Sequence, residues 1–303
     1  MQVKFCAIIK DEFLEGKNML WILYNKGKQE YNVTSIRMSC AAHTQGLKFE
    51  KVYADECCVV DGKLYKNGEL VKVLPDIVFS RCYNYEVLDF LESKNIKIIN
   101  KLSASKRARS KWETYTHMQK FEGVAQPLTF LESEMTYEEM VKTLGLPFVM
   151  KNNFGSLGKR CYLVKNKYQF SAIKRHNREV EFIVQKYIDT SFGKDIRVYV
   201  IGDHVVGAVV RMARNGDFRA NISLGGTFEP IECSEELASL SLAIARHCEL
   251  EICGLDFLFG KEKLVFCEIN SNAGFTAFSK QNIMIRDDMM IHLKNKYGDL
   301  IKK

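Results

Sequence analysis

The chain has 303 residues, of which 47% are hydrophobic and 27% charged, with only 4 prolines. That composition is ordinary for a soluble globular protein, and the length is too great for most single compact cores, so we expect two or three domains. The net charge of +7, from 44 basic and 37 acidic residues, favours anionic ligands or an acidic partner without requiring nucleic acid. No nucleic-acid-binding signature stands out in the sequence.

No apolar run approaches the roughly 18 residues that a membrane-spanning helix needs, and the apolar run at 5–9 is too short for a signal peptide. We therefore expect a cytoplasmic protein with no membrane partner. Most of the 10 cysteines lie in apolar segments, as reduced thiols do in a cytosol. Cys40 and His43 have the spacing of a pair of zinc ligands, but the sequence has no second pair to complete a zinc site, so none is expected.

The first hundred residues alternate between strand-like and helix-like segments. The pattern predicts a helix that ends within 16–27, a helix over 85–94, and strands over 3–9, 52–65, 70–73, 75–80 and 96–99. Asp61-Gly62 and Asn67-Gly68 are turn signals that break the strand-rich stretch. Strands that alternate with helices predict a small α/β domain with a largely parallel sheet.

A basic stretch over 101–111 is typical of a linker or a helix start. After it, the pattern predicts a capping box at Thr136 and Glu139 within a mostly helical segment over 112–147, and further helices over 168–177, 234–249 and 287–296. Strands are expected over 148–151, 160–164 and 181–188 and in two hairpins, which turn at Gly202-Asp203 and at 260–263.

Three oxygen-bearing side chains lie on the second hairpin. Asp256 is on its first strand, while Glu268 and Asn270 are on its second strand, two residues apart and therefore on one face. Carboxylates on otherwise apolar strands are costly to bury without a partner. A hard cation such as Mg²⁺ prefers such ligands and shares its octahedron with substrate phosphates. A pair of strand carboxylates that faces solvent at a sheet edge explains the segment equally well.

A glycine loop at 152–160 joins two of the expected strands and directly follows Lys151. Gly155 and Gly158 give the backbone the freedom to turn its N–H groups toward phosphate oxygens. A lysine at the end of the preceding strand can reach the phosphates of a nucleotide. Without that lysine the signal would be weak, because an ordinary hairpin loop also often holds two glycines.

Arginines follow the first hairpin, at Arg211 and Arg214 and within Asp217-Phe-Arg-Ala-Asn221. They suit phosphate or carboxylate groups, although a basic surface loop would have the same composition. Together the motifs run in a fixed order, from two lysines through the glycine loop and the arginines to the three oxygen-bearing residues. That order resembles the ATP-grasp superfamily and, within it, the RimK-like carboxylate–amine ligases, over about residues 98–278.

The resemblance implies an ATP-grasp fold of the α/β (α+β) class, in which a small N-terminal α/β domain precedes two α+β subdomains that sandwich ATP. The expected boundaries are an N-terminal pre-ATP-grasp domain at 1–100, a central subdomain at 101–184 and a C-terminal subdomain with the Mg²⁺ site at 185–303. The first hundred residues agree with the family only in their general α/β character.

The resemblance also implies roles for individual residues. The residues expected around ATP are Lys111 and Lys151 at its phosphates, Gly155, Ser156 and Gly158 in the mobile loop, Gln185, Lys186, Tyr187 and Ile188 along adenine, and Asp195 near the ribose. Those expected near the γ-phosphate and the reacting carboxylate are Arg211, Arg219 and Asn221. The expected Mg²⁺ ligands are Asp256, Glu268 and Asn270, with Glu268 bridging two ions.

Three positions depart from the family's usual pattern. Lys186 stands where a glutamate is usual, which matters little if only its backbone contacts adenine. Lys159 and Arg160 stand where the loop usually has a third glycine, which is expected to slow or stiffen its closure. Ala273-Gly274 replaces a usual Pro-Gly beside the acceptor site, so the identity of the acceptor is the least transferable part of the resemblance.

The resemblance implies an ATP-dependent ligase that uses Mg²⁺, or Mn²⁺ in its place. A substrate carboxylate takes the γ-phosphate as an acyl phosphate, and an amine then displaces the phosphate to form an amide. The expected amine is an amino acid such as glutamate, and the acceptor is a peptide, a protein tail or a small molecule. The alternatives are a small-molecule kinase with the same ATP site and a nucleotide-binding module without catalysis. A homo-oligomer also stays open.

Overall fold

The computed structural model describes residues 19–26, 29–214, 216–275 and 285–301. The chain divides into two compact units, one formed by 1–103 with 282–303 and the other by 104–281. Each unit has its own sheets and its own hydrophobic core. Within the described ranges, no helix combines the length and the apolar character that a membrane span requires.

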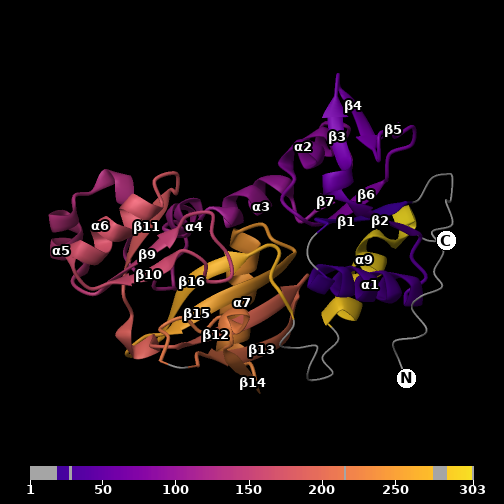
Figure 1. Ribbon diagram of the computed structural model, residues 1–303. Helices are drawn as coiled ribbons and strands as arrows, with labels where there is room; N and C mark the ends of the chain where they lie inside the picture. The colour runs from indigo at the N-terminus through magenta and orange to yellow at the C-terminus, as the bar shows by residue number, and fades with distance from the viewer. Residues whose placement is uncertain (1–18, 27–28, 215, 276–284, 302–303) are drawn as a thin grey trace. The chain divides into compact units, whose positions relative to one another are not determined.

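The first unit is built on a parallel sheet whose strand order is β2-β1-β6-β7. Its strands are β1 (Leu20–Tyr24), β2 (Phe49–Tyr53), β6 (Ile77–Arg81) and β7 (Lys97–Ile99), connected in part by the helices α1 (Gln29–Thr44) and α2 (Tyr85–Ser93) (Figure 1). This arrangement confirms the predicted small α/β domain with a parallel sheet. The predicted strand near 75–80, the helix near 85–94 and the strand near 96–99 are all present.

The prediction of a helix end over 16–27 was wrong in its described part, because Leu20–Tyr24 forms strand β1. All five residues of β1 are buried, and a short apolar run without alternation fits a buried strand as well as a helix. The helix α1 was not predicted. The predicted strand over 3–9 lies outside the described residues.

A three-stranded antiparallel sheet stands between β2 and β6 in the chain. It consists of β3 (Cys57–Val60), β4 (Lys63–Lys66) and β5 (Glu69–Leu70). Both predicted turns are confirmed, because Asp61 and Asn67 adopt positive φ angles of 50° and 53° and are each followed by a glycine that does the same. The predicted strand over 70–73 extends no further than Leu70.

The C-terminal helix α9 (Ile285–Ile301) packs against α1 and belongs to the first unit. The sequence had placed this segment in a C-terminal subdomain over 185–303. Its buried residues are Ile285, Met289, Met290, Leu293, Gly298 and Ile301, and they include an apolar stripe that a helix must cover with another element. A stripe of this kind does not specify which unit covers it, so the boundary could not be read from the sequence.

The second unit begins with an antiparallel sheet of order β10-β9-β11-β8. Its elements are α3 (Leu102–Arg109), α4 (Lys111–Met118), β8 (Thr129–Leu131), α5 (Tyr137–Leu144), β9 (Phe148–Asn152), β10 (Cys161–Val164), α6 (Lys167–His176) and β11 (Phe182–Lys186). The capping box of Thr136 and Glu139 is confirmed at the start of α5. The segment over 112–147 is only partly helical, because it also contains strand β8, which was not predicted.

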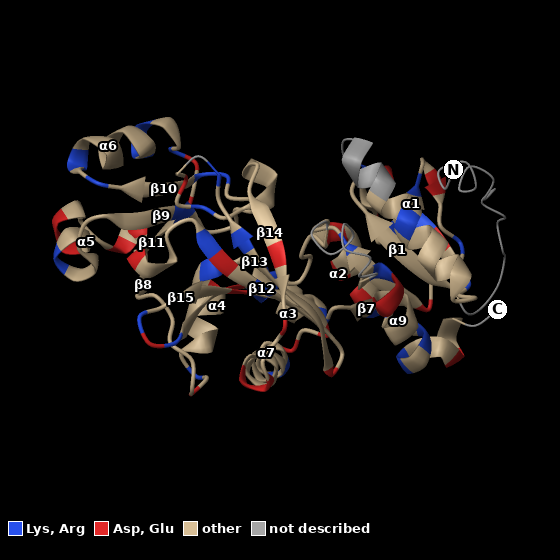
Figure 2. Cartoon of the chain, turned by 90° about the horizontal axis from the view of Figure 1, so that it is seen from below, with Lys and Arg blue, Asp and Glu red and all other residues tan. Residues whose placement is uncertain are grey.

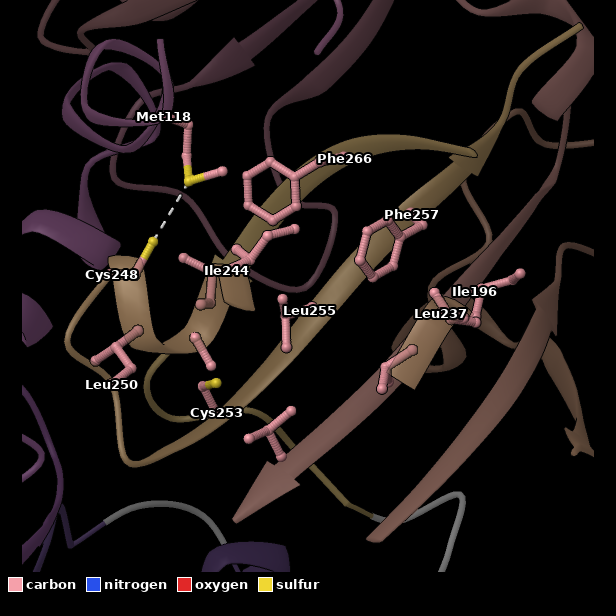
Figure 3. Packing of buried hydrophobic residues seen from close by; sticks show 14 of the residues in the cluster. Met118, Ile196, Leu237, Ile244, Cys248, Leu250, Cys253, Leu255, Phe257 and Phe266 are labelled. Carbon is pink, nitrogen blue, oxygen red and sulfur yellow. Dashed lines mark hydrogen bonds between the residues drawn. The ribbon is translucent and has the colours of Figure 1, made fainter. Parts of the chain in front are cut away.

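A second antiparallel sheet, of order β14-β13-β12-β15-β16, completes this unit. It consists of β12 (Lys194–Ile201), β13 (His204–Met212), β14 (Thr227–Ile231), β15 (Ile252–Phe259) and β16 (Leu264–Asn270). Both predicted hairpins are confirmed, whereas β14 was not predicted. The helix α7 (Glu235–His247) packs on one face, where Ile244 lies among Leu255, Phe257 and Phe266, with Met118 of α4 beside them (Figure 3).

The alternation of side chains on this sheet separates its apolar face from a polar face. Ile196, Val198, Leu255 and Phe257 belong to the core beneath α7, and their neighbours along each strand therefore point to the opposite face. Those neighbours include Asp195, Arg197 and Asp256. The fold thus collects charged groups on the face of the sheet away from α7.

Candidate active site

A pocket lies in the second unit, with residues of both of its sheets in its lining. It has about 910 Å³ of empty space, with the open solvent at its mouth included. Every predicted site residue except Asn270 is in its lining, namely Lys111, Lys151, Gly155, Ser156, Gly158, Gln185, Lys186, Tyr187, Ile188, Asp195, Arg211, Arg219, Asn221, Asp256 and Glu268. The fold therefore brings together residues that span about half of the chain.

The pocket is strongly basic. Its lining includes seven Lys or Arg residues and three Asp or Glu residues. Figure 2 shows Lys and Arg gathered where β9 and β10 face β12 and β13. Such a surplus of positive charge in a concave site attracts anionic ligands.

The side of the pocket formed by β12, β13 and β15 is called the sheet wall below. Two arginines and two aspartates form a continuous ion network on it. Arg197 donates to both oxygens of Asp256, from Nε and Nη2, at 2.6 Å each. Arg211 binds both oxygens of Asp195, at 2.6 and 2.7 Å, and its Nη2 also lies 3.0 Å from Oδ2 of Asp256. The side chains of Arg211 and Asp256 are only 4% and 5% exposed. Removing one member would leave a buried charge without its partner.

Burial and pairing act in opposite directions on the two aspartates. Burial raises the pKa of Asp195, and Asp256 adds to that effect against the opposing influence of Arg211. Burial alone would also raise the pKa of Asp256, but Arg197 and Arg211 outweigh it and hold that pKa well below its ordinary value of 3.8. The pKa values of the two aspartates are therefore shifted in opposite directions, and the difference follows from the number of arginines that contact each one.

Glu268 lies directly across from Asp256 in the β15–β16 pairing. A bulge in β16 leaves Cys267 without a partner in that pairing, so that Cys267 and Glu268 both line the pocket although they are adjacent. Asn270 donates from Nδ2 to Oε1 of Glu268 at 3.3 Å. Carboxylate and amide oxygens on neighbouring strands fit a hard divalent cation. Glu268 is partly exposed, whereas both oxygens of Asp256 already accept from guanidinium groups.

Two lysines reach the pocket from the opposite side. Nζ of Lys111, the first residue of α4, donates to Gly155 O at 2.6 Å and lies 3.9 Å from Oε2 of Glu268. Burial lowers the pKa of Lys111, and Lys151 adds to that lowering against Glu268. Burial also acts to lower the pKa of Lys151, but Cys267, Glu268 and Cys161 outweigh it, so this pKa is raised.

The glycine loop between β9 and β10 is bonded to the segment that follows β13. Arg219 Nη1 donates to Gly158 O at 2.9 Å, and Ser223 Oγ donates to Leu157 O at 3.1 Å. Gly158 has φ of +70°, and a Cβ there would lie 2.7 Å from Oδ1 of Asn221. A side chain at this position would therefore both strain the backbone and collide with Asn221.

The segment 185–188, expected along adenine, begins with the last two residues of β11 and continues past the end of the strand. Gln185 is buried and donates from Nε2 to Thr129 Oγ1 at 2.8 Å. Lys186 donates its backbone N–H to Leu128 O at 2.8 Å, while its side chain is exposed. The apolar residues Val149, Phe218 and Leu258 also line the pocket and offer a surface against which a flat ring can pack.

Sequence reasoning missed several residues of the site. Arg197 was not singled out, although it stands two residues after Asp195 and therefore on the same strand face. Cys161 and Cys267 were read only as small hydrophobic residues, yet both line the pocket, and Lys151 donates to Sγ of Cys267 at 3.8 Å. Lys194, the first residue of β12, is also in the lining, but strand alternation would have placed it on the face opposite to Asp195.

The comparison with protein families decides the identity of this chain. The RimK-like ATP-grasp domain matches residues 108–293, which is more than half of the sequence. The chain belongs to the RimK-like ATP-grasp family. It is an ATP-grasp ligase that forms carbon–nitrogen bonds, and its fold is the ATP-grasp fold, as the sequence predicted.

Individual proteins agree with the family match. The chain is 29% identical to N-acetylaspartylglutamate synthase A of Homo sapiens over 286 residues, which cover 87% of this chain and 72% of that protein. It is 28% identical to a probable alpha-L-glutamate ligase of Pasteurella multocida over 218 residues, 71% of this chain and 69% of that protein. The ATP-grasp ligase PsnB, solved with a phosphomimetic variant of its minimal precursor, Mg and ADP, superposes with a TM-score of 0.65 at 16% identity, covering 93% of this chain and 99% of PsnB.

Proposed function

We propose that this ligase joins the amine of glutamate to a carboxylate of an acidic acceptor. The acceptor carboxylate attacks the γ-phosphorus of ATP, a P–O bond breaks, and ADP leaves as an acyl phosphate forms. The glutamate nitrogen then attacks the acyl carbon, loses a proton, and displaces inorganic phosphate. The products are an amide, ADP and phosphate, and no nucleophile of the protein is needed.

The observation that carries this proposal is the basic lining of the pocket. Two of its three acidic residues are already paired with arginines, so the excess of lysine and arginine remains for other anions. ATP accounts for part of that excess, and an acidic amino acid with an acidic acceptor would account for more. The relatives whose names include glutamate ligation support the same choice of amine.

Named residues take specific roles in this proposal. Lys111, Lys151 and Arg219 would neutralise the phosphates and the charge that develops as the phosphoryl group transfers. The segment 185–188 would hold the base, and the loop with Gly155 and Gly158 would exclude water from the acyl phosphate. Arg211 and Asn221 would contact the reacting carboxylate or the γ-phosphate.

The residues proposed to hold Mg²⁺ are Asp256, Glu268 and Asn270, which supply hard oxygen ligands. A bound ion would supply positive charge that stabilises the negative charge of the phosphates. Asp256 can take part only if its oxygens share or release the bonds from Arg197 and Arg211. Mn²⁺ has similar ligand preferences and would occupy the same residues.

The test is phosphate release from Mg-ATP with a panel of amino acids and of acidic peptides and small molecules, with products followed by intact mass. The expected product gains one glutamate residue, and ADP and phosphate form together with it. A product that gains a phosphate group instead would identify a kinase. A glutamate-independent reaction with another amino acid would overturn the choice of amine while leaving the ligase chemistry in place.

A further inference from the structure

Asn153 is a buried polar residue at the base of the glycine loop, directly after β9, and it is only 2% exposed. Its Oδ1 accepts from Ser110 Oγ at 3.2 Å and from Trp112 N at 2.9 Å. Its Nδ2 donates to Oε1 of Glu181, whose backbone carbonyl also accepts from Asn153 N at 2.9 Å. Both ends of the amide are therefore used, as acceptor toward α4 and as donor toward the start of β11.

The residue that lies between Ser110 and Trp112 is Lys111. Its own backbone N–H donates to Asn153 O at 3.2 Å. Three consecutive residues at the first turn of α4 are thus bonded to Asn153, and Ser110 also caps that turn by accepting from Glu113 N at 3.2 Å. This turn has little freedom to rotate or slide without breaking a buried hydrogen bond.

The side chain of Lys111 returns to the same loop. Its Nζ donates to Gly155 O, two residues beyond Asn153, and also lies near Glu268. We propose that Asn153 is a positioning residue, which ties Lys111 and the base of the glycine loop to β11 so that the lysine meets the nucleotide phosphates in one place. Asn153 is not in the pocket lining, so it acts through Lys111 and not by touching the substrate.

This placement matters because a small displacement of a charged group costs much of its effect on a reacting phosphate. Lys111 has a long, flexible stem, and a fixed helix turn limits the region that its Nζ can explore. The inference requires only that the pocket binds ATP. It does not depend on glutamate being the amine, so the two proposals can fail separately.

A reciprocal exchange of donor and acceptor tests the link between Asn153 and Glu181. Asn153→Asp places a carboxylate against that of Glu181, and we expect Mg-ATP affinity by calorimetry to fall at least about tenfold and kcat/KM for ATP about 100-fold. Adding Glu181→Gln restores a donor opposite the new carboxylate and should return both values to within about threefold of the wild type. Asn166→Asp is the matched control, because Asn166 caps the exposed helix α6 by accepting from Gln169 N at 3.0 Å.

The Lys111→Ala background separates positioning from general support of the fold. If Asn153 acts through Lys111, then Asn153→Asp should change Mg-ATP affinity less than about twofold once the lysine is absent. Losses that multiply in that background, wild-type affinity in Asn153→Asp, or failure of Glu181→Gln to rescue would each overturn the proposal. If Asn153→Asp does not fold, Glu181→Ala is the replacement test, because it leaves Asn153 in place. This variant must weaken Mg-ATP binding by less than the roughly tenfold expected for Asn153→Asp, and the loss must disappear in the Lys111→Ala background.

Discussion

The pocket has a sheet wall and, formed by the glycine loop between β9 and β10 and the side chains bonded to it, a loop wall. Both walls contain basic side chains, but the two are held in different ways. On the sheet wall, two arginines are paired with two aspartates in a buried network whose N–O distances are 2.6 to 3.0 Å. On the loop wall, Lys111, Arg219 and Ser223 donate to carbonyl oxygens of the loop backbone. The first wall is held by opposite charges. The glycine loop is held by bonds to its neutral carbonyl oxygens, although one of the donors, Arg219, is itself paired with Asp217.

This difference indicates which wall can move. A cationic donor bonded to a neutral carbonyl can exchange that bond for a stronger one to a phosphate oxygen. A buried ion pair opens only where another charge takes the place of the lost partner, as a metal ion would at Asp256, because the remaining charge would otherwise be unpaired. We therefore expect the sheet wall to stay fixed when nucleotide binds and the loop wall to rearrange around it.

The largest effect is expected where the sheet wall meets the proposed metal. Glu268→Ala should reduce turnover at least about 1,000-fold, because it removes a proposed Mg²⁺ ligand, while thermal unfolding stays close to that of the wild type. Phosphate release is the measurement, and Glu262→Ala on the exposed β15–β16 turn is the control. Near-normal turnover in Glu268→Ala would contradict its assignment as a ligand.

The next effect concerns the stability of the sheet wall. Asp256→Ala should lower the free energy of unfolding by about 3–5 kcal/mol, because Arg197 and Arg211 would both lose a buried partner. The control is Asp203→Ala, which breaks an exposed pair with Arg246 and should cost less than about 1 kcal/mol. Equal losses in chemical denaturation would show that the ion network does not hold this wall.

A smaller effect is expected from a lysine that lies between the walls. Lys151→Ala should weaken Mg-ATP binding about ten- to 100-fold, because one charged contact to phosphate is lost. Isothermal calorimetry measures this directly, with Lys165→Ala as an exposed control. Unchanged nucleotide affinity would argue against a phosphate contact by Lys151.

The smallest effect concerns the ion pair that orients Arg219 on the loop wall. The side-chain hydrogen bond from Arg219 holds the pKa of Asp217 below its ordinary value of 3.8. A lowered pKa means that this carboxylate stabilises the fold above about pH 3.8 and that the contribution is lost as the pH falls through the folded-state pKa. Asp217→Asn should therefore lower Tm slightly at pH 7 and by progressively less as the pH falls below about 3.8, and a pH-independent difference would exclude this linkage.

Local patterns in the sequence were sufficient for much of the scaffold. The turns at 61–62 and 67–68, the capping box at Thr136 and both hairpins of the second unit depend on neighbouring residues, and the structure confirms them. The similar distances of Asp256 and Glu268 from the turn of the second hairpin also indicated that the two could converge, and the structure pairs them across the two strands. Such features need no information about distant parts of the chain.

Other features were decided only by tertiary contacts. Leu20–Tyr24 is a strand because a parallel sheet buries it on both faces, and α9 belongs to the first unit, where it packs against α1. The pairing of Asp256 with Arg197 and the hold of Asn153 on α4 join residues that lie 59 and 41 positions apart. The sequence gives the identities of these side chains, but their partners depend on which strands and loops pack together. Local periodicity does not determine that packing, because it describes only residues that are close in the chain.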